Sequence, residues 1–127
     1  MLRVKRAYEA PAPEDGRRIL VDRLWPRGLS RERAAIDEWV KEVAPSSQLR
    51  QWFGHDPAKW SEFRKRYRQE LRQRKDLVHA LASQAARGRV TLVYGARDEQ
   101  HNDAVALAEV IRERLKRSSS TPRRRGE

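Results

Sequence analysis

Apolar residues in three short segments of the chain follow the pattern of strands. In "LRVKRAY", Leu2 and Val4 alternate with basic residues, whereas "RRILVDRL" holds the uninterrupted apolar run 19–21. "RVTLVYG", at residues 89–95, contains the second strong apolar run. Uninterrupted runs are typical of strands that are covered on both faces. We therefore expect three strands, the first two joined by the turn-rich segment 10–16.

Between and after these strands, apolar residues recur at the three- and four-residue spacing of helices. The clearest helix follows Asp56, which can cap a helix whose first residue is Pro57. An aromatic stripe repeats along this helix and is interpreted as core: Trp60, Phe63 and Tyr67, followed by Leu71. The expected helices are residues 30–43, a short turn within 47–54, the helix that begins at Pro57, residues 76–88 and residues 103–116.

This order of elements predicts a small three-layer α/β/α domain with a mainly parallel sheet of three or four strands. In an alternative arrangement, the first two strands pair as a hairpin across 10–16. Residues 1–116 are expected to form the single domain, because a chain of this length supports one core. The sequence from 116 onward, "KRSSSTPRRRGE", has five basic residues, one acid and no apolar anchor. Residues 117–127 are therefore expected to be a disordered basic tail.

The composition excludes several classes of site and favours one class of partner. The chain has 127 residues, no cysteine and a net charge of +11, which excludes disulfides, thiolate metal sites and cysteine nucleophiles. No segment has the length of a membrane span or the features of a signal peptide, so we expect a cytoplasmic protein with no membrane partner. The positive charge favours anionic partners, from phosphorylated metabolites to nucleic acid.

The first polar cluster, "VDRLWPRGLS" at residues 21–30, begins where a predicted strand ends. Arg23 and Arg27 carry planar guanidinium groups that match the oxygens of phosphate or carboxylate. Trp25 offers an apolar wall, Gly28 permits a sharp turn, and Asp22 is expected to orient one arginine. In the alternative interpretation the acid and one arginine are only a structural clasp, with the tryptophan in the core.

The second cluster, "YGARDEQHND" at residues 94–103, lies between a strand and a helix. The N–H groups at the start of a helix attract anions. Asp98 and His101 are spaced to form an acid/base pair in which the carboxylate holds the imidazole. Alternatively, Asp98 or Asn102 is an ordinary helix cap and His101 is solvated.

The third cluster, "LRQWFGHDP" at residues 49–57, occupies a short element bounded by turns, a common setting for functional groups. Arg50 and Trp52 add a cation and an aromatic ring, and His55 is a candidate general base. His55, Asp98 and His101 would form a two-histidine, one-carboxylate metal set if they converged. Their spacing matches no standard metal motif, and a histidine that packs near a helix start is the simpler interpretation.

The first two clusters follow strand ends, which in an α/β sheet form the usual ligand crevice. We predict that residues 22–28, 50–56 and 94–102 form one polar pocket. Candidate catalytic residues are Asp22, His55, Asp98 and His101, and candidate ligand-binding residues are Arg23, Trp25, Arg27, Gly28, Arg50, Trp52 and Asn102; no metal ligand is assigned.

Several catalytic signatures are absent from the sequence, including the glycine-rich nucleotide loops and the serine-hydrolase and zinc-protease motifs. The densest basic stretch is "RKRYRQELRQRK" at 64–75, with five arginines, two lysines and one acid. It is most simply the solvated face of a helix. A rival function uses this face and the tail to contact nucleic acid.

The motifs "VDRLWPRG", "LRQWFGHD" and "ARDEQHN" together resemble the YeaO-like family of bacterial proteins, a domain of unknown function (DUF488). The resemblance runs from about Val4 to Leu115. It implies no established activity, and although some members are labelled transcriptional regulators, this sequence shows no helix-turn-helix. The family's motif residues correspond here to Asp22, Arg23, Trp25, Arg27, Gly28, Arg50, Trp52, Phe53, His55, Asp56, Asp98 and Asn102.

The sequence therefore predicts a protein that binds a compact anion, such as a phosphate-bearing metabolite or nucleotide. Whether it is an enzyme is left open: if it is, His55 or His101 is the acid/base and Asp22 or Asp98 orients it. No cofactor and no oligomeric state are indicated. A third interpretation makes the motifs purely structural, supporting an interaction domain without catalysis.

Overall fold

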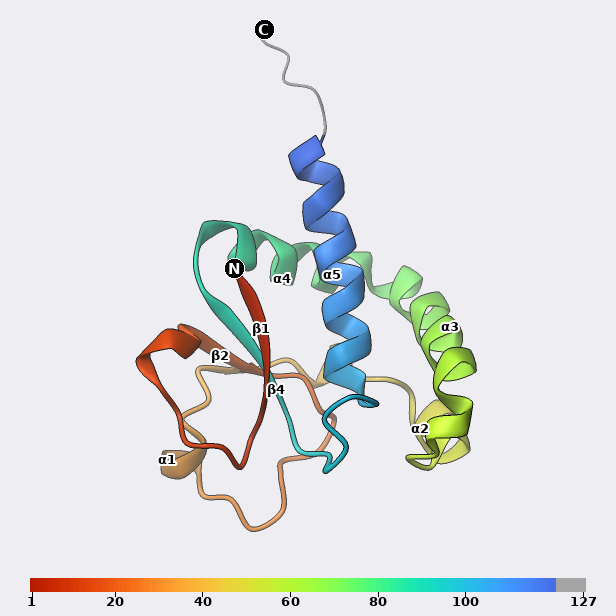
Figure 1. Cartoon of the computed structure of the whole chain (residues 1–127), viewed down its shortest axis with the longest axis horizontal. Helices are drawn as coiled ribbons and strands as arrows, with labels where there is room; N and C mark the ends of the chain where they lie inside the picture. Colours follow the sequence, from red (N-terminus) through yellow and green to blue (C-terminus); the bar gives the residue numbers. More distant parts are fainter. Residues whose placement is uncertain (121–127) are drawn as a thin grey trace, which may run out of the picture.

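The computed structural model of the chain describes residues 1–120 and shows an α/β domain (Figure 1). Its sheet consists of β1 (Leu2–Arg6), β2 (Arg17–Leu20), β3 (Glu38–Trp39) and β4 (Val90–Tyr94). All pairings are parallel and the strand order is β1-β4-β2-β3. The predicted parallel sheet is confirmed. The alternative hairpin is wrong, because β4 lies between β1 and β2 and pairs with both.

Five α-helices and four 3-10 turns connect and cover these strands in the described part of the chain. The helices are α1 (Arg31–Ala34), α2 (Ser47–Phe53), α3 (Trp60–Leu71), α4 (Lys75–Arg87) and α5 (Asp103–Ser120). The turns are η1 (Pro13–Asp15), η2 (Lys41–Val43), η3 (Pro57–Lys59) and η4 (Arg72–Arg74). Helix α5 continues past residue 116, where the sequence predicts its end. Residues 121–127, the rest of the predicted tail, lie outside the described residues.

The predicted helix 30–43 is wrong. Ala35 ends α1 after one turn in a left-handed conformation, with φ of 50°. The chain then runs beside β2: the Asp37 N–H donates to the Arg18 carbonyl, and the Val40 N–H donates to the Leu20 carbonyl. These bonds make 38–39 an edge strand. The partner strand determines this outcome, and helical spacing within a short segment does not reveal it.

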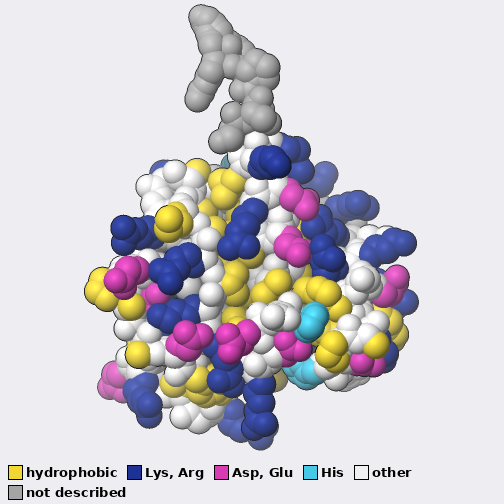
Figure 2. All heavy atoms as spheres, in the orientation of Figure 1, with side chains coloured by type: hydrophobic (Ala, Val, Ile, Leu, Met, Phe, Trp, Pro, Cys, Tyr) yellow, Lys and Arg dark blue, Asp and Glu magenta, His cyan; other side chains and the backbone are white. Residues whose placement is uncertain are grey.

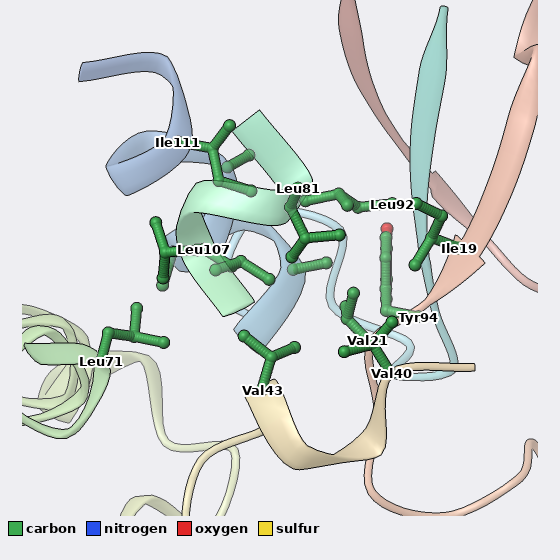
Figure 3. Packing of buried hydrophobic residues seen from close by; sticks show 14 of the residues in the cluster. Ile19, Val21, Val40, Val43, Leu71, Leu81, Leu92, Tyr94, Leu107 and Ile111 are labelled. Carbon is green, nitrogen blue, oxygen red and sulfur yellow. The ribbon is translucent and has the colours of Figure 1, made fainter. Parts of the chain in front are cut away.

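One face of the sheet packs against α4 and α5 to form the main core. Ile19 and Leu92 from the sheet meet Leu81 of α4 and Leu107 of α5, and all four side chains are buried (Figure 3). Phe63 and the other apolar residues of the aromatic stripe join the same cluster, as the sequence predicts.

The opposite face of the sheet is covered by the segment 25–39, which contains α1. Leu20 and Val93 from the sheet pack there against Trp25, Ile36 and Trp39. This layer holds one turn of helix and a loop, so the three-layer order is present with one thin layer (Figure 1). Within residues 1–120, no helix combines the length and the apolar character that crossing a membrane requires.

A buried ionic network fastens η1 to the same face. The Asp15 carboxylate accepts from Arg18 Nη1 at 2.7 Å and from Lys5 Nζ at 3.1 Å. Arg18 also donates through Nε and Nη2 to the Ala34 carbonyl. Asp15 and Arg18 are only 1% and 3% exposed. Each buried charge is therefore compensated, which is the condition for keeping an ion pair inside a domain.

Candidate functional site

The structure places a cavity of about 350 Å³ where β2 and β4 end. Segments from both strand ends, from α2 and from the start of α5 line it, which is the usual position of a ligand crevice in an α/β sheet. The lining residues are Asp22, Arg23, Leu24, Pro45, Ser47, Arg50, Gln51, Phe53, His55, Phe63, Ala96, Asn102 and Asp103.

Two carboxyl groups, those of Asp22 and Asp103, meet in this cavity. Asp22 follows β2, and its Oδ2 accepts from the Gly95 N–H at 2.8 Å, which joins the ends of β2 and β4. Asp103 is the first residue of α5, and its side chain is hydrogen-bonded to that of Asp22. A carboxyl pair in contact must hold a proton, since two adjacent carboxylates repel each other strongly.

The surroundings of the pair keep that proton in place. Burial raises the pKa of Asp22, and the bonds from Asp103 and Gly95 together with the charge of Arg50 offset only part of the increase. Burial and the adjacent Asp22 hold the pKa of Asp103 well above its ordinary value. While the pair holds a proton, the Asp103 carboxyl donates to the Asp22 carboxylate and the pair carries one negative charge.

Two arginines supply positive charge beside the acid pair. Arg50 projects from α2, and Ser46 caps this helix by accepting from the Leu49 N–H. Arg23 donates through Nη2 to the Pro45 carbonyl at 3.2 Å. Its Nε is buried and has no hydrogen-bond partner among the described residues. An unpaired buried donor costs about 1–3 kcal/mol. A hydrogen-bond acceptor on a bound ligand would remove this cost at Arg23 Nε.

His55 lies in the cavity wall and has a strained backbone conformation. The residue has φ of 57°, directly after Gly54 at φ of 55°. Left-handed conformation is unfavourable for a residue with a side chain, and strain of this kind gathers at functional sites. The turn puts the imidazole ring beside Phe53, with centroids 6.3 Å apart. Phe53 stacks in turn on Phe63 at 4.3 Å, so one wall of the cavity is aromatic.

Five of the predicted site residues line the cavity, namely Asp22, Arg23, Arg50, His55 and Asn102. Asn102 is buried and serves as a cap of α5: its Oδ1 accepts from the Val105 N–H, and its Nδ2 donates to the Asp98 carbonyl. The predicted clasp between Asp22 and a neighbouring arginine is not among the ion pairs of residues 1–120, because the Asp22 carboxyl is used by Gly95 and Asp103.

Three predicted residues of the first cluster lie in the opposite layer of the domain. Trp25 donates through Nε1 to the Leu29 carbonyl at 2.6 Å and packs edge-on against Trp39 at 5.6 Å. Gly28, with φ of 76°, lies in the turn between Trp25 and Leu29. Arg27 is exposed, and its carbonyl accepts from the Tyr8 hydroxyl. These residues support the loop that carries Asp22 and do not line the cavity.

Trp52 also lies away from the cavity, on the outer side of α2. Its ring is covered by the Arg66 guanidinium at 4.2 Å and approached by the Lys59 ammonium at 5.1 Å. Lys59 in addition donates to the Trp52 carbonyl at 2.8 Å. The ring is therefore engaged by two cations of η3 and α3, and it ties these elements to α2.

Asp98 and His101 form the pair that their spacing predicts, with Oδ2 and Nδ1 2.9 Å apart. The carboxylate also accepts from the N–H groups of Gln100 and His101. These hydrogen bonds lower the pKa of Asp98, and the bond from Gln100 has the largest effect. The imidazole packs edge-on against Trp60 at 5.3 Å. The pair lies beside the cavity and is not part of its lining. Within residues 1–120, no group of three or more acidic, histidine or cysteine side chains is arranged to hold a metal ion.

Asp103 is the cavity residue that sequence reasoning missed. An acid in the first turn of a helix has an ordinary explanation, because it complements the helix dipole, so its type and position gave no reason to assign it to a site. The signal that could have found it was its place as the last residue of the second polar cluster, 94–103. Phe53 and Phe63 were expected as motif or core residues, and they turn out to form a cavity wall as well.

Over residues 1–125 the chain matches the family described as the inactive DUF488-N3 subclade. The chain belongs to this family. The uncharacterised Escherichia coli (strain K12) protein YeaO is 40% identical over 111 residues, covering 87% of this chain and 96% of YeaO. The predicted relationship to the YeaO-like DUF488 family is confirmed.

The DUF488 relationship extends to mycobacteria. The uncharacterised protein Mb3100c of Mycobacterium bovis is 39% identical over 110 residues, covering 87% of this chain and 92% of the relative. The uncharacterised protein Rv3073c of Mycobacterium tuberculosis (strain H37Rv) matches with the same identity and coverage. No solved structure matches the chain.

Proposed function

We propose that this DUF488 protein binds a compact phosphate-bearing ligand, of the size of a nucleotide or sugar phosphate, in the cavity at the strand ends. One observation carries the proposal: two arginines and a carboxyl pair, from separate segments of the chain, line one cavity of about 350 Å³. This volume lies within the range of ligand pockets.

The arginines define the anionic end of the ligand. Arg23 and Arg50 carry two positive charges, and the acid pair carries one negative charge while it holds its proton. The balance favours an anion near the arginines. A phosphate oxygen would satisfy the buried Arg23 Nε and accept from the Arg50 fork, since planar guanidinium groups bind phosphate through paired hydrogen bonds.

The carboxyl pair defines a second, uncharged end of the ligand. Asp22 and Asp103 carry acceptor oxygens that bond well to hydroxyl or amino hydrogens. A sugar or nucleoside offers such donors at a short distance from its phosphate, and the aromatic wall of Phe53 and Phe63 offers a surface for a ring. Inorganic phosphate would use the arginines alone.

In this proposal the protein binds the phosphate-bearing ligand without converting it to a product. The description of the matched family contains the word "inactive". The Asp98–His101 pair, the arrangement most typical of acid/base chemistry, does not line the cavity. His55 is the one histidine among the lining residues, and no carboxylate is paired with it in the described part of the chain. A sensor or carrier of the ligand fits these observations.

A thermal-shift panel tests the proposal with the full chain against nucleotides, sugar phosphates, carboxylates and inorganic phosphate. A ligand that binds only the folded state must raise the melting temperature. We expect a phosphorylated sugar or nucleotide to give the largest increase, Arg50→Gln to abolish it, and Arg27→Gln to leave it unchanged. Arg27 is the matched control, because it is an exposed arginine outside the cavity. No response to any phosphorylated compound, in a protein that melts cooperatively, refutes the proposal.

A further inference from the structure

A second concave surface, the basic groove, lies between the α3–η4–α4 connection and the second half of α5. It encloses about 500 Å³ and is separate from the strand-end cavity, with which it shares no residue. Figure 2 shows Lys and Arg side chains gathered beside the upper half of α5 and toward α3. The groove is lined by Arg68, Leu71, Arg72, Lys75, Val78, Val110, Glu113, Arg114 and Arg117.

The groove has an excess of cations that the protein does not neutralise. Arg68 is paired, with two bonds of 2.8 Å to the Glu113 carboxylate. Arg72, Lys75 and Arg114 form no ion pair with any residue among 1–120. Arg114 Nη2 lies 3.0 Å from Nδ1 of His79, and this contact involves no acid. Like charges held together in a concave surface repel each other, and a bound polyanion relieves this repulsion.

The basic stretch 64–75 is divided by the fold into two parts. Arg64 pairs with Glu109 at 2.8 Å and Arg66 with Glu62 at 2.9 Å, while Arg74 donates to the Ala44 carbonyl. These cations serve the helix packing. The groove cations Arg72 and Lys75 lie at the turn into α4 and have no such role. The sequence predicts that this stretch is the solvated face of a helix, with a nucleic-acid contact as the rival, and in the structure only Arg68, Arg72 and Lys75 among its cations line the groove.

The lining of the groove favours nucleic acid over a protein partner. Its apolar residues are Leu71 and Val78, which are buried, and Val110, which is half-buried. None of the large exposed hydrophobic residues of the described chain belongs to it: these are Met1, Tyr8 and Leu24. Protein interfaces depend on apolar or aromatic anchors, whereas binding to a phosphate backbone depends on Lys and Arg. The sequence beyond α5, which adds three consecutive arginines, extends the same charge along the chain.

We infer that the basic groove binds the phosphate backbone of nucleic acid without reading its sequence. Arg72, Lys75 and Arg114 line the groove without an ion pair to any residue among 1–120, so several phosphates are neutralised at once. No aromatic ring lines the groove, so base stacking makes no contribution there. Binding is then governed by counterion release and falls steeply as salt is added.

Fluorescence anisotropy of a short labelled duplex DNA, titrated with the full chain over about 50–200 mM salt, tests the inference. We expect the triple variant R72Q/K75Q/R114Q to bind about tenfold or more weakly at low salt and to flatten the salt slope by about 2–3 units. The matched control is R33Q/R87Q/R89Q, which removes the same charge from exposed residues outside the groove. The control should keep most of the affinity.

Three results would overturn the inference: no binding by the unmodified chain at low salt, equal losses in the two triple variants, or equally tight binding of a poly-glutamate of matched charge. Equal losses would show an effect of net charge alone, and poly-glutamate binding would favour an acidic protein segment. Circular dichroism of both variants confirms that they are folded. Arg50→Gln leaves this binding unchanged, so the groove and the cavity fail or succeed separately.

Discussion

The carboxyl groups of Asp22 and Asp103 share a hydrogen bond, although the first residue follows β2 and the second begins α5. Because Asp22 also accepts from the Gly95 N–H, the end of β4 is tied to the same point. The pair thus joins three elements while it leaves acid oxygens in a cavity. Such an arrangement sacrifices some stability for a polar site.

Replacing Asp103 by Asn removes an acid whose pKa is held well above its ordinary value by burial and the adjacent Asp22, and it should stabilise the protein at neutral pH by about 0.5–2 kcal/mol. A carboxyl with a raised folded pKa binds its proton more tightly in the folded state. The folded state of the unmodified protein therefore loses stability as pH rises from the ordinary pKa through the raised one. Urea unfolding at neutral and acidic pH measures the effect. The gain should shrink toward acidic pH; a variant less stable than the original at neutral pH contradicts the assignment.

Arg18→Met should destabilise the domain by about 3–5 kcal/mol, because it leaves the buried Asp15 carboxylate with one partner fewer and the Ala34 carbonyl unpaired. The neighbouring Arg17 is the control. It forms an exposed pair with Glu38 at 3.1 Å, with about half of each side chain accessible to solvent. Arg17→Met should therefore change the free energy of unfolding by less than about 1 kcal/mol. Chemical denaturation compares the two, and similar losses would show that burial is not the cause.

His55→Gly tests whether the left-handed turn serves the cavity. Glycine tolerates φ of 57° without the side-chain penalty, so stability should be retained or raised by up to about 1 kcal/mol. Ala35→Gly is the control, since that residue has φ of 50° and lies outside the cavity. Both variants should melt at or above the temperature of the original. Weaker phosphate-ligand binding is expected for His55→Gly alone, and an equal effect of both would assign the turn a purely structural role.

Trp25→Phe should lower stability by about 1–2 kcal/mol through loss of the bond to the Leu29 carbonyl and of the contact with Trp39. Ligand binding by the cavity should persist, because Trp25 lies in the opposite layer. Thermal unfolding with and without a ligand from the phosphate panel separates the two effects. Binding lost at unchanged stability would place the indole in the site after all.

Local patterns in the sequence account for most of the elements. The apolar run 19–21, the run in 90–94 and the aromatic stripe of α3 each become core, since period and composition reflect which face is buried. The sequence did not predict the conformation of 35–40, because it depends on hydrogen bonds to the carbonyl groups of Arg18 and Leu20 in β2. These partners lie outside the local segment whose pattern was read. A two-residue edge strand offers too few positions for a pattern.

The sequence by itself determined the α/β class, the family, and the three clusters from which the cavity is built, because these are written in residue types and short spacings. Only the tertiary structure decided which members of each cluster meet. In the irregular segment 22–28, Asp22 and Arg23 line the cavity, whereas Trp25 packs in the opposite layer. Likewise, Asp103 becomes a site residue only when the start of α5 is placed against the end of β2. These contacts join residues that are distant in the sequence, so they depend on how the whole chain packs and not on local patterns.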